Sequence, residues 1–160
     1  MMYVAVFLLT LTFGLSLYTD MKRYKIKNVV TLPTSLAGIL CAPFFVPPLQ
    51  FGLYLILLMG IGYIGWNMGL WKAGDTKLML ASGVWMVFII GPSMLFVLFY
   101  YLAFIVLHLC IGHFLGLKKY RFNLKQYLLG LRTKVNETFG TIPGTFLIMC
   151  SFFISFFIYK

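Results

Sequence analysis

The chain alternates between long apolar runs and short segments that contain its basic residues. The apolar runs cover residues 2–17, 29–46, 51–68, 78–117 and 142–159. As one helix, the fourth run would be about 60 Å long, twice the thickness of the hydrocarbon layer of a membrane. Gly91-Pro92-Ser93 is a typical turn sequence inside that run, so we expect two helices there. The pattern therefore predicts about six transmembrane helices.

Residues 118–137 show a different pattern, with six basic side chains and apolar residues at helical spacing. The apolar positions at i, i+3, i+4 and i+7 are Leu124, Tyr127, Leu128 and Leu131. Asn123 stands where a helix cap is expected. We interpret this segment as a short amphipathic helix on the cytoplasmic membrane surface. The last span follows it and is opened by Pro143, near the first turn, where a missing N–H costs little.

The composition agrees with a protein whose surface faces lipid. Of the 160 residues, 62% are hydrophobic and only 10% are charged, whereas a soluble domain usually carries about 25% charged residues. No soluble segment interrupts the spans, so residues 1–160 form a single membrane domain of the all-α class. The net charge of +10 would suit nucleic acid, but no soluble basic domain is present to bind it.

The basic residues indicate the orientation. Six spans put three loops on one side, and these loops hold twelve of the thirteen Lys and Arg residues. Because basic loops stay in the cytoplasm and attract anionic lipid, we expect both termini outside an inner or plasma membrane. The three cysteines lie in or beside apolar runs without a CxxC pair, and His108 and His113 are five residues apart. We interpret all five as packing or interfacial residues, and no metal site is expected.

Acidic residues are rare: Asp20, Asp75 and Glu137 are the only three. Asp20 ends the first span and Asp75 begins the fourth, so two spans lie between them. An even number of crossings returns the chain to the same side, and both aspartates are therefore expected at one membrane face. Acidic residues in or near spans are costly and are often functional.

Two neighbouring carboxylates suggest a catalytic pair that shares one proton. The ionised partner would act as general base on water, and the protonated one would polarise a peptide carbonyl. Other interpretations are open. Asp75 has the position of a helix cap, and Asp20 has basic neighbours, Lys22 and Arg23, with which to pair. A small proton- or cation-coupled transporter would use the same carboxylates.

Three short segments resemble the type IV prepilin peptidases, which belong to the intramembrane aspartyl proteases with a GxGD motif. Ala73-Gly74-Asp75-Thr76-Lys77, after a glycine-rich span, resembles their GxGDxK signature. Asp20, Ile26 and Asn28 have the spacing of their D-x5-I-P-N motif. The segment 142–147, which contains Pro143, resembles the sequence that opens their last helix. The three segments occur in the family's order across the six-span layout.

The resemblance implies an aspartic endopeptidase in which Asp20 and Asp75 are catalytic. Gly74 would allow close backbone approach, Lys77 would have a positional role, and Ile26, Asn28 and Pro143 would shape the site. The implied substrates are prepilin-like membrane proteins, whose basic leader is removed after a glycine at the cytoplasmic face. Glycine-rich helix contacts would admit such a substrate from the bilayer. The chain lacks the segment with which longer relatives methylate the product, so we expect peptidase activity alone, with water as nucleophile and without a cofactor.

Two positions depart from the family pattern. Lys72 replaces the first glycine of GxGD, and Lys27 replaces the proline before Asn28. The first replacement removes backbone freedom before Asp75 and brings a positive charge that favours ionised carboxylates. A non-catalytic pilus-assembly factor is therefore a further alternative to the protease.

Overall fold

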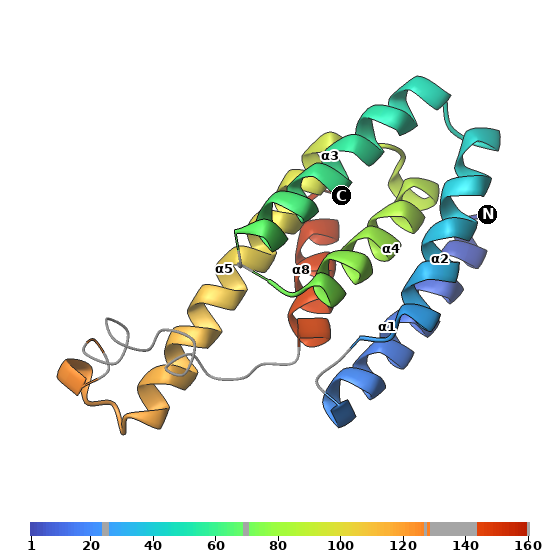
Figure 1. Ribbon diagram of the computed structural model, residues 1–160. Coiled ribbons are helices and arrows are strands. Elements are labelled where there is room, and N and C mark those ends of the chain that lie inside the picture. The colour runs from blue at the N-terminus through green and yellow to red at the C-terminus, as the bar shows by residue number, and fades with distance from the viewer. Residues whose placement is uncertain (24–25, 69–70, 127, 129–143, 160) are drawn as a thin grey trace.

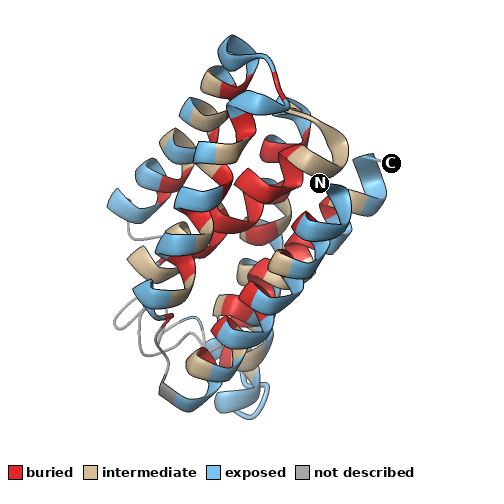
Figure 2. Cartoon of the chain, turned by 90° about the vertical axis from the view of Figure 1, so that its right-hand side faces the viewer, coloured by how far each residue is buried: buried red, intermediate tan, exposed pale blue. Residues whose placement is uncertain are grey.

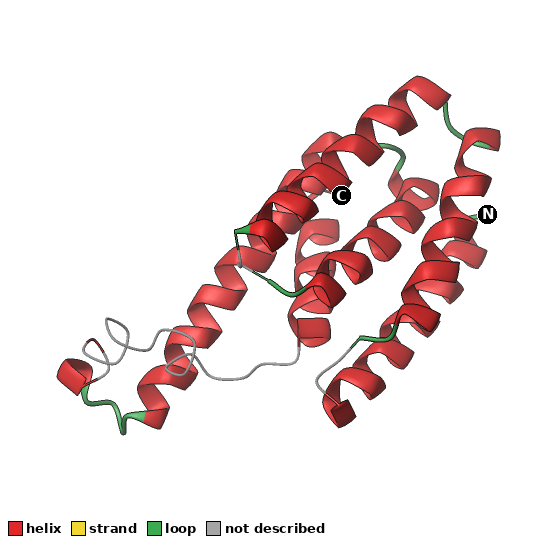
Figure 3. Ribbon diagram, viewed as in Figure 1, coloured by secondary structure: helices red, strands yellow, loops and turns green. Residues whose placement is uncertain are grey.

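The computed structural model describes residues 1–23, 26–68, 71–126, 128 and 144–159. This part of the chain contains helices and no strand (Figure 3). The helices are α1 (Met2–Arg23), α2 (Asn28–Cys41), the 3-10 helix η1 (Ala42–Phe44), α3 (Pro48–Asn67), α4 (Ala73–Ile90), α5 (Met94–Lys119) and α8 (Gly144–Tyr159). The predicted all-α class is therefore correct for the described residues.

Four of these helices, α1, α3, α4 and α5, are long and apolar enough to cross a membrane. Asn28–Phe44 and Gly144–Tyr159 are also apolar but shorter. Pro43 explains why α2 is short. It stands in η1 and ends regular α-helical hydrogen bonding just after Cys41. The 16 residues of α8 rise about 24 Å, less than the roughly 30 Å of hydrocarbon. The count of six spans therefore stays a prediction.

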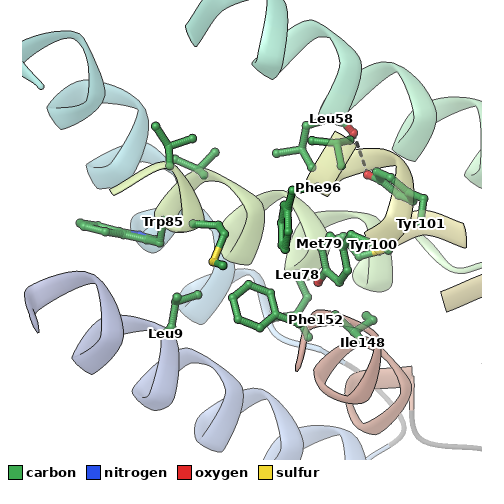
Figure 4. Packing of buried hydrophobic residues seen from close by; sticks show 14 of the residues in the cluster. Leu9, Leu58, Leu78, Met79, Trp85, Phe96, Tyr100, Tyr101, Ile148 and Phe152 are labelled. Carbon is green, nitrogen blue, oxygen red and sulfur yellow. Dashed lines mark hydrogen bonds between the residues drawn. The ribbon is translucent and has the colours of Figure 1, made fainter. Parts of the chain in front are cut away.

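The central helix of the bundle is α4, which packs against α1, α2, α3 and α8 (Figure 1). Its side chains are buried through most of its length, including Leu78, Met79 and Trp85. Aromatic rings from α5 and α8 complete the core around it (Figure 4). Each helix has buried and exposed positions along its length (Figure 2). The exposed positions include large apolar side chains such as Phe7 and Ile56. An apolar outer face is what lipid contact requires.

Glycines in α3 admit aromatic side chains. A Cβ on Gly65 would overlap the Trp71 indole, whose Nε1 donates a hydrogen bond to the Gly62 carbonyl (3.1 Å). Trp71 also stacks on Tyr101 of α5, with ring centroids 5.7 Å apart. Gly65 therefore provides space for a ring inside the protein and is covered; Gly69 lies outside the described residues. The expected substrate entry through these glycines has no support at Gly65.

Some helices end at other residues than the apolar runs of the sequence. The first helix continues to Arg23, beyond the end of the apolar run at residue 17, because no Gly or Pro stops it there. The turn at 91–93 is confirmed, and Gly91 has a positive φ of 83°, which favours glycine. Asn123 Oδ1 accepts a hydrogen bond from the Gln126 N–H (3.2 Å), as expected of a cap. Of the segment predicted as an amphipathic helix, residues 127 and 129–137 lie outside the described residues; 118 and 119 belong to α5, and 124–126 are helical after a turn.

Candidate active site

Asp20 lies in the last turns of α1 with its side chain buried, only 5% exposed. Its Oδ2 accepts a hydrogen bond from the backbone N–H of Thr145 at 2.9 Å. This N–H belongs to the first turn of α8, where backbone donors lack partners within the helix and the helix dipole favours negative charge. Lys22 lies over the Tyr18 ring, 5.7 Å from its centroid. Asp20 is therefore buried and does not lie in a solvated loop, and the structure gives it no ion pair with Lys22; the side chain of Arg23, the other suggested partner, lies outside the described residues.

Asp75 lies in the first turn of α4 and is 9% exposed. Its Oδ2 accepts the backbone N–H of Lys72 at 3.0 Å, so it caps the helix as the sequence position suggested. Its Oδ1 presses against Gly144, where a Cβ would overlap it. A capping role alone does not explain why the start of another helix approaches this carboxylate so closely.

The two aspartates meet at the start of α8. Asp20 bonds to Thr145 and Asp75 contacts Gly144, so the two contact points are one peptide unit apart, about 3.8 Å between Cα atoms. The Asp20 charge acts on the Asp75 carboxyl, as expected at this proximity. Each carboxylate has one oxygen held by a backbone N–H. Within the described residues its other oxygen has no hydrogen bond.

The remaining motif residues join the two aspartate segments. Ile26 is buried, and its Cβ lies 3.3 Å from the place a Cβ on Gly74 would occupy. The close approach that Gly74 allows is therefore to Ile26. Lys77 Nζ donates a hydrogen bond to Asn28 Oδ1 at 2.9 Å. These contacts fasten the start of α2 to the start of α4, beside Asp75.

The two departures from the family motif fit the backbone without strain. Lys72 has φ −83° and ψ 158°, an extended conformation open to any residue, so glycine is not needed there. Its side chain is exposed, and its charge interacts with the Asp75 carboxyl. Lys27 has φ −83°, close to the value that proline imposes. The lysine at 72 therefore changes the charge near the site and leaves its backbone geometry intact.

Gly144, Thr145 and Ser16 are site residues that the sequence interpretation missed. Ser16 precedes Asp20 by one helical turn on the same face of α1. The hydroxyls of Ser16 and Thr145 are fully buried and have no hydrogen-bond partner among the described residues. Gly144 and Thr145 stand inside the third motif segment, directly after Pro143, which itself lies outside the described residues. Their place in this motif segment was the sequence signal that could have identified Gly144 and Thr145 as site residues.

Within the described residues, the arrangement provides two buried carboxylates that each keep one oxygen without a hydrogen bond, and two buried hydroxyls, of Ser16 and Thr145, that have no partner. Buried hydroxyls without partners are costly, and a bound water is the usual way to satisfy them. The site therefore has the acceptors to hold a water and the acidic groups to move its protons. Of the remaining candidate residues, His108 stacks on Phe104 at 6.0 Å between ring centroids, and Cys41, Cys110 and Cys150 are free thiols.

No protein-family model matches the chain, and no match was found among curated proteins or solved structures. The likeness to prepilin peptidases therefore rests on its three motif segments.

Proposed function

We propose that this chain is an intramembrane aspartic endopeptidase, and that Asp20 and Asp75 are its catalytic pair. The observation that carries the proposal is the meeting of both aspartates at adjacent residues, Gly144 and Thr145. Asp20 lies in α1, Asp75 in α4, and the two residues that they contact in α8. Packing that brings two costly buried acids together serves chemistry better than it serves stability.

The chemistry follows from the arrangement of the oxygens. One oxygen of each carboxylate is fixed by a backbone N–H, which sets the orientation of the group. In this mechanism the two remaining oxygens bind the attacking water and the substrate carbonyl. The ionised member of the pair removes a proton from water as it attacks, and the protonated member donates to the carbonyl oxygen. After the tetrahedral intermediate collapses, the pair returns a proton to the leaving amine.

The substrate class comes from the motif resemblance. In this proposal the protein removes the basic leader of prepilin-like membrane proteins, cutting after a glycine at the cytoplasmic face of the inner or plasma membrane. Both chain termini then lie outside.

The test is leader removal in co-expressing membranes, followed by mass spectrometry of candidate prepilin-like substrates. Asp20→Asn and Asp75→Asn keep the shape and an oxygen acceptor, and both should abolish cleavage. Glu137→Gln is the matched control, because it removes the only other acid in the sequence. Cleavage that survives either aspartate substitution in a folded variant contradicts the mechanism.

A second candidate, a proton- or cation-coupled transporter, is favoured by one observation. Thr12, Ser16 and Asp20 follow one another at four-residue spacing on α1, and all three are buried. Such a line of polar groups leads from the carboxylate into the apolar bundle. Purified protein in liposomes distinguishes the candidates: a transporter produces an Asp20-dependent proton or cation flux without any substrate, and a protease produces none. A non-catalytic assembly factor would tolerate either aspartate substitution.

A further inference from the structure

Two buried hydroxyls, one on α1 and one on α2, lack the hydrogen bond that such groups usually make. A serine or threonine inside a helix commonly donates to the carbonyl oxygen one turn earlier, as Ser35, Ser82 and Ser151 do at 2.7, 2.9 and 2.6 Å. Ser16 Oγ and Thr31 Oγ1 have no partner among the described residues, although these residues are only 0% and 1% exposed. Because a buried hydroxyl without a partner costs free energy, both groups call for a polar ligand.

The packing of α1 against α2 places these two hydroxyls opposite each other. The second helix follows the first after a short connection, so the two are antiparallel neighbours. Thr12 Oγ1 donates to Thr34 Oγ1 at 3.3 Å, and this bond fixes the register of the helices. Ser16 lies about 6 Å further along α1 and Thr31 about 4.5 Å back along α2, so both stand one turn closer to the connection. They form the next polar pair of the interface.

This pair lies one helical turn from the Asp20 carboxylate. Ser16 and Asp20 are four residues apart on α1, which puts their Cβ atoms about 6 Å apart on one face. Asp20 Oδ2 accepts the Thr145 N–H, so Oδ1 is the oxygen left for a further donor. A buried water typically makes about three hydrogen bonds. Ser16 Oγ, Thr31 Oγ1 and Asp20 Oδ1 are three such partners.

Asp75 has less to stabilise a negative charge. The neighbouring hydroxyl, of Thr76, donates to the Gly62 carbonyl oxygen at 3.4 Å and is therefore engaged elsewhere. The charge of Lys72 acts on Asp75, but this side chain is exposed and solvent screens it. Donors that bond to a carboxylate favour its ionised form. Of the two acids, Asp20 is the better placed to hold the charge.

We propose that Ser16 and Thr31 are positioning residues that hold a water on Asp20 Oδ1, and that this water makes Asp20 the ionised general base of the pair. The inference rests on the proposed protease function. A carboxylate oxygen accepts two hydrogen bonds, so Oδ1 binds this water and the attacking water together. The positioned water stays in place and is not consumed.

The proton transfers then balance within the pair. As the attacking water bonds to the peptide carbon, it gives one proton to Asp20, and Asp75 gives its proton to the carbonyl oxygen. When the C–N bond breaks, Asp20 protonates the leaving amine and Asp75 recovers a proton from a hydroxyl of the intermediate. The pair ends as it began, with Asp20 ionised.

The pH dependence of kcat/KM tests this assignment, with a single-span protein that carries a basic leader, a glycine and an apolar helix as substrate. Ser16→Ala and Thr31→Val each remove one partner of the water. If Asp20 carries the charge, the loss destabilises the active form and the fully ionised form equally. Only the acid limb should then move, by about one pH unit to higher pH, which lowers kcat/KM about tenfold on that limb. Thr31→Ser keeps the hydroxyl and should keep the profile.

The contrary outcomes are distinct. If Asp75 carried the charge, the same substitutions would move only the alkaline limb, and the assignment of Asp20 as base would be overturned. An unmoved profile in folded variants would overturn the role of the water. Failure of the protease function differs from both, because it appears as absent cleavage by the unmodified protein at every pH.

Ser155→Ala is the matched control. Its hydroxyl is also fully buried without a partner among the described residues, but it lies ten residues along α8 from Thr145, about 15 Å away. Both limbs should stay in place in this variant. The charged side chains described at this end of α1, α2 and α4 are the same in every variant, so they do not contribute to a shift, and the described part of α8 carries none. They are Lys22, Lys27, Lys72 and Lys77.

A crystal structure of the unmodified protein, at a resolution that shows ordered water, gives a readout independent of activity and of the folding of any variant. We expect a water within hydrogen-bond distance of Ser16 Oγ, Thr31 Oγ1 and Asp20 Oδ1. Hydroxyls bonded to each other, or to carbonyl oxygens of their own helices, would overturn the proposal.

Discussion

Gly144→Ala adds a single methyl group at the point where α8 meets Asp75. The new Cβ would overlap Asp75 Oδ1 and lie 2.9 Å from Cγ and 3.3 Å from Oδ2. The glycine has no positive φ, so the effect of the substitution comes from this overlap and not from backbone strain. Either the carboxylate or the start of α8 has to move.

Both movements break a hydrogen bond at the site. If Asp75 moves, it loses the Lys72 N–H; if α8 moves, Asp20 loses the Thr145 N–H. A hydrogen bond to a charged group contributes roughly 1.5–3 kcal/mol, so we expect a loss of this order in the free energy of unfolding. A displacement of about 1 Å at a catalytic group costs roughly a hundredfold in rate. The expected result is therefore a kcat reduced about a hundredfold.

The assay is leader cleavage by purified protein in nanodiscs, together with thermal unfolding of the same preparation. Gly52→Ala is the control, since a Cβ at that position meets no atom within 4 Å. It should keep full activity and gain up to about 1 kcal/mol in stability from better helix propensity. Wild-type cleavage by Gly144→Ala would refute the close packing of α8 against Asp75 and with it the geometric case for the pair.

Three further predictions concern the surroundings of the pair. Lys72→Gly should change cleavage less than about threefold, because the backbone there is already in an ordinary extended conformation; a tenfold gain would show that the missing motif glycine impairs the enzyme. Asn28→Ala and Lys77→Met should each reduce activity, and the double variant should be no worse than either single one, because both remove the same hydrogen bond; additive losses would contradict this. Thr145→Val removes a buried hydroxyl that has no partner among the described residues, so the free energy of unfolding should be unchanged or rise by about 1 kcal/mol. If this hydroxyl holds the attacking water, cleavage should fall, and an unchanged kcat would exclude that role.

The general class of the protein was readable from local properties of the chain. Hydropathy depends on each segment by itself, so the apolar helices and the turn at Gly91 followed from the sequence alone. The count of crossings between Asp20 and Asp75 suggested one membrane face for both, and the structure places them together at the start of α8. The motif spacing singled out Ile26, Gly74, Asn28 and Lys77, which contact one another in pairs.

The tertiary structure alone decided which groups surround the pair. Nothing in the local sequence indicates that α8 begins against Asp75, because that contact joins residues 75 and 144 and depends on how α1, α4 and α8 pack. Helix ends were also beyond the hydropathy pattern, since backbone hydrogen bonding continues α1 through Asp20 into polar sequence. An apolar groove lined by Phe13 of α1 and Phe152 of α8 exists only because these two helix surfaces do not close completely against each other. Such contacts depend on the shapes of side chains far apart in the chain, whereas burial in lipid depends on the polarity of each residue.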